Sequence, residues 1–153
     1  MPKKLMLDTN IYDRIIARRG FTDRLNQAVV AGHIEILRTH IQDDEIARIP
    51  NAAKQAEMRK VRVRKIPTSG AAWGISRWGE ARWGGSGAVK FSDITKGNPI
   101  HAEDALIAMT AEVEADVLVT EDRAMETRVR EKSKRLEVWR FDQLVTFVEG
   151  FPE

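Results

Sequence analysis

Hydrophobic positions along the chain form short continuous runs that are separated by amphipathic stretches. The runs in residues 3–8 (KKLMLD) and 116–122 (DVLVTED) do not alternate with polar residues, which is typical of strands buried on both faces of a sheet. Residues 34–41 (IEILRTHI) alternate well enough for another strand, and residues 136–141 (LEVWRF) predict a last one.

The stretches between these strands carry apolar residues at helical spacing. Thr9 or Asn10 can cap a helix that contains the next isoleucines, and Gly32 is suited to end a second helix. The acids of residues 42–49 favour the first turn of a third helix, because they complement the helix dipole. Further helices are predicted over residues 52–65, 99–115, 123–135 and 142–150. Since helices and strands alternate, we expect an α/β fold with a central, mainly parallel sheet.

Composition narrows the class of protein. The chain has 153 residues, 42% hydrophobic and 31% charged, so we expect one folded domain over residues 1–153. Its apolar runs are too short to cross a bilayer or to form the core of a signal peptide. Cysteine is absent, which excludes disulfides and cysteine zinc sites and agrees with a reducing compartment. We therefore expect a cytoplasmic protein with no membrane partner.

The basic residues are clustered, although the formal net charge is only +2. Residues 54–65 contain six basic residues and one acid, and residues 123–135 contain six basic residues and two acids. Each cluster alone is equally well explained as a solvated helix face. Together they predict a positive surface around a negative centre.

Four acids stand where such a sheet would gather them. Asp8 ends the first strand and Asp122 follows the run VLVT, so both are expected at the carboxyl edge of the sheet, where ligands bind in this class of fold. Glu45 lies just after the second strand, and Asp104 lies on the helix before the run VLVT. Each acid alone is also explained as a helix cap or a surface charge. Their closest competitors for the inward position are Asp43, Asp44, Glu103 and Glu121.

Convergent carboxylates raise each other's pKa unless a cation compensates their charge. Ligands that are all oxygen select hard ions such as Mg²⁺ or Mn²⁺. Such ions can activate a water for the hydrolysis of a phosphodiester. The set of four therefore predicts metal-dependent hydrolysis.

The motifs LMLDTNI, QDDEIA, EDALIAMTA and VLVTEDRAM, followed by LEVWRFDQLV, together resemble the PIN-domain family of metal-dependent ribonucleases. The resemblance implies a three-layer α/β/α sandwich and an endoribonuclease that uses Mg²⁺ or Mn²⁺. It implies that the metal ligands and catalytic residues are Asp8, Glu45, Asp104 and Asp122. It gives supporting roles to Asn10, which would orient Asp8, to Thr120, and to the neighbouring Glu121. The VapC-type toxins of toxin–antitoxin pairs are also similar, which implies a homodimer silenced by an antitoxin protein.

Residues 67–98 depart from the PIN pattern and form a Gly/Trp-rich loop or insertion. Trp73, Trp78 and Trp83 recur every five residues, which matches neither a helix nor a strand face. Their rings can stack on unpaired bases, anchor a protein partner, or simply pack onto the domain. The residues expected to contact RNA are Arg59, Lys60, Arg62, Arg64, Arg77, Arg82 and Trp78.

Two other functions are compatible with parts of the pattern. An aspartate-based phosphohydrolase needs a second aspartate two residues after the first, but Asn10 stands in that place. A PIN-like module that binds RNA or protein without cutting it would share the fold and could dispense with the acids, whereas all four are present.

Overall fold

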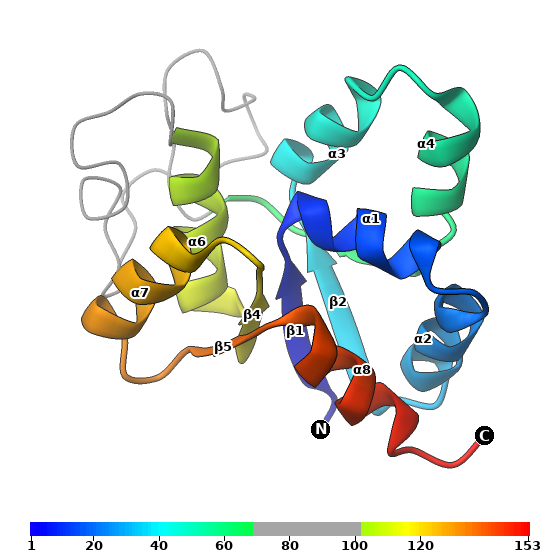
Figure 1. Cartoon of the computed structure of the whole chain (residues 1–153). Coiled ribbons are helices and arrows are strands. Elements are labelled where there is room, and N and C mark those ends of the chain that lie inside the picture. The colour runs from blue at the N-terminus through cyan, green and yellow to red at the C-terminus, as the bar shows by residue number, and fades with distance from the viewer. Residues whose placement is uncertain (69–101) are drawn as a thin grey trace.

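The structure is a computed structural model that describes residues 1–68 and 102–153. Within these residues the strands form one sheet in the order β3-β2-β1-β4-β5, and every neighbouring pair is parallel (Figure 1). The strands are β1 (Lys3–Leu7), β2 (Ile34–Arg38), β3 (Arg64–Lys65), β4 (Val117–Val119) and β5 (Glu137–Trp139). The predicted α/β fold with a parallel sheet is confirmed.

Helices cover both faces of this sheet, so the molecule has the expected three α/β/α layers (Figure 1). The helices are α1 (Thr9–Ala17), α2 (Phe21–Val30), α3 (His40–Ala47), α4 (Ala52–Met58), α6 (Ala102–Glu114), α7 (Arg123–Lys132) and α8 (Phe141–Glu149). α1, α2 and α8 pack in one hydrophobic core with Leu5 and Leu7 of β1. α6 and α7 pack in a second core with Met6 of β1 and Leu118 of β4.

The two strands predicted to be buried on both faces lie side by side at the centre of the sheet. All residues of β4 are 0% exposed, as are Leu5, Met6 and Leu7 of β1. Because side chains alternate along a strand, Met6 contributes to one core while its neighbours contribute to the other. A strand placed between two helical layers must be apolar throughout, which explains the continuous runs in the sequence.

The helix predicted over residues 52–65 ends seven residues early. α4 ends at Met58, and Arg64–Lys65 form the edge strand β3 beside β2. The Asn26 side chain of α2 accepts a hydrogen bond from the Arg62 N–H (2.8 Å) and donates one to the Lys60 carbonyl (2.8 Å). These contacts hold the backbone in an extended path, and the alternating valines and arginines suit a strand. The expected helix is therefore wrong beyond Met58.

The second strand is also shorter than predicted. β2 ends at Arg38, and His40, which we expected in the strand, begins α3. Thr39 caps this helix through a capping box with Gln42. Glu45 consequently lies in the second turn of α3 rather than the first.

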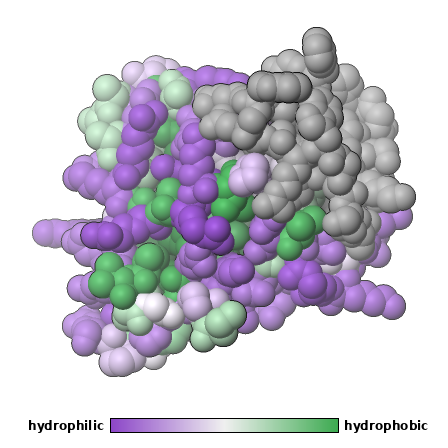
Figure 2. Space-filling model, turned by 180° about the vertical axis from the view of Figure 1, so that it is seen from behind, coloured by the Kyte–Doolittle hydropathy of each residue, from purple (hydrophilic) through white to green (hydrophobic). Residues whose placement is uncertain are grey.

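The surface seen from behind is mostly hydrophilic, with small hydrophobic areas between the polar side chains (Figure 2). In the described part of the chain, no helix has the length and apolar character needed to cross a bilayer. Trp139 is partly buried against the first core. The other tryptophans and Arg77 and Arg82 belong to residues 69–101, outside the described residues, so the predictions for them stay predictions.

Candidate functional site

The carboxyl edge of the sheet brings together the four acids singled out in the sequence. Asp8 directly follows β1, and its N–H donates to the Val119 carbonyl of β4 (3.0 Å), which joins the ends of the two central strands. Asp122 caps α7, Asp104 lies in the first turn of α6, and Glu45 lies on α3. Each of the four is close enough to another to repel its charge.

Asp8 is the most deeply buried of these acids, at 6% exposed. Its Oδ1 accepts the Thr9 N–H (2.8 Å) and its Oδ2 accepts the Thr120 hydroxyl (2.9 Å). Burial raises the pKa of the Asp8 carboxyl above its ordinary value. The hydrogen bonds from Thr120 and Thr9 offset part of this rise, and the charge of Asp122 adds to it.

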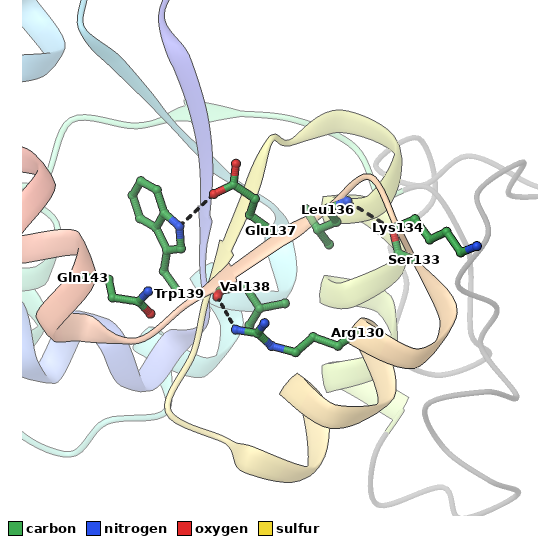
Figure 3. A pocket seen from close by; sticks show the side chains of 8 residues that line it. All are labelled: Arg130, Ser133, Lys134, Leu136, Glu137, Val138, Trp139 and Gln143. Atoms are coloured by element: carbon green, nitrogen blue, oxygen red, sulfur yellow. Dashed lines mark hydrogen bonds between the residues drawn. The ribbon is translucent and has the colours of Figure 1, made fainter.

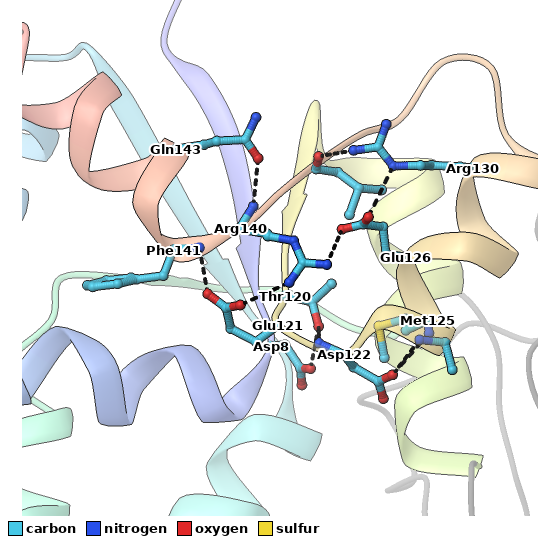
Figure 4. Close-up of polar contacts among 12 residues, drawn as sticks. Asp8, Thr120, Glu121, Asp122, Met125, Glu126, Arg130, Arg140, Phe141 and Gln143 are labelled. Carbon is cyan, nitrogen blue, oxygen red and sulfur yellow. Dashed lines mark hydrogen bonds and ion pairs between the residues drawn. The ribbon is translucent and has the colours of Figure 1, made fainter.

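Thr120 couples Asp8 to Asp122. Its Oγ1 donates to Asp8 and accepts the N–H of Asp122 (3.0 Å), so one buried hydroxyl fixes both acids (Figure 4). Asp122 Oδ1 accepts the N–H groups of Ala124 (2.9 Å) and Met125 (3.1 Å) at the start of α7. Its Oδ2 takes no part in this cap and is left for another ligand.

Glu45 is an acid with a strongly raised pKa. Burial raises the pKa of its carboxyl from 4.5 to about 7. The Thr9 hydroxyl offsets part of this rise, while the charges of Glu103, Asp8 and Asp104 add to it. Among the described residues, Glu45 Oε1 and Thr9 Oγ1 are nonetheless buried without a hydrogen-bond partner at normal geometry. A buried carboxylate oxygen without a partner is costly, and it marks a place where a ligand would be stabilising.

Asp104 is the second acid with a strongly raised pKa. Burial raises the pKa of its carboxyl from 3.8 to about 6, and the charges of Asp8 and Asp122 raise it further. Its neighbour Glu103, which competed with it in the sequence, instead pairs with Arg48 of the loop after α3 (3.0 Å). Glu103 still adds to the pKa of Asp104, but its own charge has a partner.

Glu121 does not support the acidic site. Its side chain points away from Asp8 toward α8, where Oε1 accepts the Phe141 N–H (3.0 Å) (Figure 4). It also pairs with Arg140 (3.4 Å) and Arg14 (3.8 Å). Its supporting role at the metal was wrong, because side chains alternate after β4 and Glu121 follows the side opposite to that of its neighbours.

The expected role of Asn10 is also wrong. Asn10 is exposed in the first turn of α1, whereas the hydrogen bonds that fix Asp8 come from Thr9 and Thr120.

Glu121→Ala is expected to lower the free energy of unfolding by about 1–2 kcal/mol, because it removes the cap of α8. Glu121→Gln is the matched control, since its amide oxygen can still accept the Phe141 N–H and should retain most of that stability. Urea denaturation of both variants measures the effect. Neither variant should change the affinity for Mn²⁺. A similar loss of Mn²⁺ affinity in both variants would show that Glu121 supports the acidic site.

Sequence reasoning missed Gln42, which links the segments carrying Asp8 and Glu45. This side chain is completely buried. Its Nε2 donates to the carbonyl of Leu7 (3.1 Å), the residue before Asp8, and also contacts Met6 Sδ (3.1 Å). Its Oε1 accepts the Thr39 N–H (2.9 Å) at the start of α3. The T-x-x-Q spacing of a capping box is visible in the sequence, but the contact with β1 is not.

Gln42→Met keeps the side-chain volume and leaves the Leu7 carbonyl and the Thr39 N–H without a buried partner. We expect a loss of about 2–3 kcal/mol in the free energy of unfolding. We also expect a loss of about 10-fold or more in Mn²⁺ affinity, since the acid-bearing segments are no longer held in register. Leu25→Ala in α2 is a control of similar instability and should leave Mn²⁺ affinity unchanged. Equal Mn²⁺ affinity in the two variants would show that Gln42 only stabilises the core.

The donors at this edge fit a hard divalent cation. Four carboxylates supply only oxygen, three of them have raised pKa values, and Glu45 Oε1 is buried without a hydrogen-bond partner among the described residues. Among residues 1–68 and 102–153, no three His, Asp or Glu side chains already stand close enough to share one ion. Like charges repel, so a cation would have to draw these carboxylates inward to complete its shell.

The described basic residues that are expected to contact RNA lie beside α2 and β2. Arg62 lines a hollow along α2 together with Asn26 and Val30. Arg59 and Lys60 are exposed beside it, and Arg64 pairs with Glu35 on β2. In β3, Arg64 lies in register with Leu37 near the carboxyl end of β2, because the helix predicted to carry these residues ends early.

Comparisons with known proteins show the fold and nothing more specific. No family model matches the chain, and no curated protein is significantly similar to it. The crystal structure of PAE2754 from Pyrobaculum aerophilum is similar, with a TM-score of 0.55 and 14% sequence identity. The similarity covers 99% of this chain and 100% of that one, so the two chains share the same fold over their whole length.

Proposed function

We propose that this protein is an endoribonuclease that depends on Mg²⁺ or Mn²⁺ and hydrolyses RNA phosphodiester bonds at the carboxyl edge of its sheet. The observation that carries the proposal is the group of four mutually repelling carboxylates, in which Glu45 keeps a buried oxygen that has no hydrogen-bond partner in residues 1–68 and 102–153. Such an arrangement is unfavourable for the fold alone. Strongly perturbed acids gathered at one place are typical of functional sites.

The side chains divide the work in this proposal. Asp8, Asp104, Asp122 and Glu45 would hold the cation, with Asp122 using Oδ2 and Glu45 using Oε1. When bound, Mg²⁺ or Mn²⁺ would compensate the carboxylates, lower the pKa of a water and stabilise charge on the phosphate. Thr120 holds Asp8 and Asp122 in fixed orientations, and Gln42 holds the Asp8 segment against α3. Because Asp8 is buried, bulk water has little access to its carboxylate.

The experiment is cleavage of a panel of single-stranded and structured RNAs by purified protein in Mg²⁺ or Mn²⁺. Cleavage should disappear when a chelator is added and return when the metal is restored. RNA that binds but stays uncut with either metal would favour a non-catalytic RNA-binding module. The same assay with single-stranded DNA tests whether the 2′-hydroxyl is required.

The resemblance to VapC-type toxins extends the proposal to a cytoplasmic homodimer silenced by an antitoxin protein. Sedimentation of the purified chain tests the dimer. Growth arrest on expression, relieved by a small protein encoded beside this chain, tests the antitoxin. Normal growth with an active nuclease would leave a ribonuclease without a toxin role.

A further inference from the structure

A second polar site lies along the open edge of β5, between α7 and α8 (Figure 3). A hollow of about 420 Å³ is lined by Arg130, Lys134, Trp139 and Gln143, among others. A neighbouring hollow of about 390 Å³ shares Trp139 and Gln143 and adds Phe147. Because they share two residues, the hollows form one groove with a cationic end and an aromatic end.

The cationic end offers hydrogen-bond donors that the fold does not use. Lys134 is exposed and follows the end of α7, and it has no partner among the described residues. Arg130 Nη2 donates to the Val138 carbonyl (2.9 Å), which leaves other N–H groups of the guanidinium facing the hollow. The Gln143 Oε1 accepts the Arg140 N–H (2.9 Å), so its NH₂ group remains available.

The acids beside this end are already paired. Glu137 accepts the Trp139 Nε1–H (3.0 Å) and lies 3.7 Å from Lys3. Glu126 pairs with Arg140 (3.6 Å) and Arg130 (3.8 Å). The end of the groove lined by Arg130 and Lys134 therefore favours an anion.

The aromatic end offers two tilted rings, with the Lys3 ammonium 5.6 Å from the Trp139 ring. The Trp139 and Phe147 rings lie 5.0 Å apart and are tilted by 56°, and both are only partly buried. Asp142 and Thr146 complete this end of the groove. A ligand that carries both an anionic group and a flat ring could occupy the cationic end and the aromatic end of the groove together.

We infer that this groove is a subsite for a nucleotide of single-stranded RNA, with its phosphate at Arg130 and Lys134 and its base against Trp139. This inference rests on the proposed function. Asp122 of the acidic site caps α7, and Arg130 lies about 12 Å of helical rise further along this helix. One substrate strand can therefore lie along α7 and contact both sites. Between them Glu121 and Glu126 are neutralised by arginines, so the path does not repel phosphate.

The test measures binding of a short fluorescent single-stranded RNA to the Asp8→Asn protein in chelator, at several salt concentrations. Lys134→Gln should weaken binding several-fold and reduce the salt slope by about 0.7, the value for one lost phosphate contact on a single strand. Trp139→Leu should weaken binding by about 5-fold or more through lost stacking. Lys132→Gln is the matched control, because it removes the same charge nearby from a residue that does not line the groove.

Equal Kd values for Lys134→Gln and Lys132→Gln would overturn the subsite, and Lys134 is exposed, so misfolding cannot explain that result. The subsite would also be overturned if poly-glutamate binding depended on Lys134 in the same way and Trp139→Leu left RNA affinity unchanged. That pair of results would indicate a surface that binds any anion. Cleavage by the native protein is scored separately. If RNA binding depends on Lys134 but no RNA is cut, the subsite is retained and the nuclease proposal is rejected. If RNA is cut but its binding does not depend on Lys134, the nuclease proposal is retained and the subsite is rejected.

Discussion

Asp8→Asn is expected to reduce metal-dependent RNA cleavage by at least about 100-fold. Removing a residue that only supports a metal ligand typically costs 10- to 100-fold, and Asp8 is expected to be a ligand itself. The asparagine has the same shape and can keep an acceptor for Thr9 or Thr120. The loss should therefore come from the missing charge, not from a change in the fold.

The same substitution should leave the metal-free protein as stable as before, or slightly more stable. Asp8 is buried beside other acids, so its ionised form is unfavourable without a cation. Urea denaturation in chelator measures this, and RNA cleavage in Mn²⁺ measures activity. Asp23→Asn, which changes an exposed acid in the first turn of α2, is the matched control and should keep full activity. If Asp8→Asn cuts RNA as fast as the native protein, the acidic site is not the nuclease site.

Raising the pH from about 4 to about 7 should destabilise the metal-free protein by about 2–3 kcal/mol. Glu45 has a pKa of about 7 and Asp104 of about 6 in the folded state, against 4.5 and 3.8 in the unfolded state. Within this window the folded state binds more protons, so the free energy of unfolding falls as pH rises. Below this pH window the two carboxyls are protonated in both the folded and the unfolded state. Above it they are ionised in both states, and the free energy of unfolding has fallen by the full amount. The magnitude is about half of the full conversion, because these carboxyls are partly exposed to solvent.

Urea denaturation in chelator at several pH values between 4 and 8 measures this slope. Glu45→Gln should make this slope shallower, because one of the two titrating carboxyls is gone. Glu131→Gln on the exposed face of α7 is the matched control and should leave the slope unchanged. Mg²⁺ at 100 times its Kd should restore about 2.7 kcal/mol at pH 8. A flat profile in chelator together with no stabilisation by Mg²⁺ or Mn²⁺ would remove the physical basis of the metal site.

The pattern of the sequence determined the architecture and the edge at which the acids meet. Continuous apolar runs are required of strands between two helical layers, and the carboxyl ends of parallel strands share one edge. Asp8 and Asp122 could therefore be assigned to the same place from their positions after two such runs. The end of α4 could not be predicted, because it depends on the contacts of Asn26 with a distant part of the chain.

Only the tertiary structure decided which acids face the site and how strongly their pKa values change. Glu103 and Glu121 sit next to Asp104 and Asp122 in the chain, yet Arg48 pairs with one and the start of α8 binds the other. The pKa of a carboxyl depends on burial and on charges that are near in space, and neither quantity is local in sequence. The bridge made by Gln42 is of the same kind, since a buried amide finds its partners only after the sheet and α3 have packed.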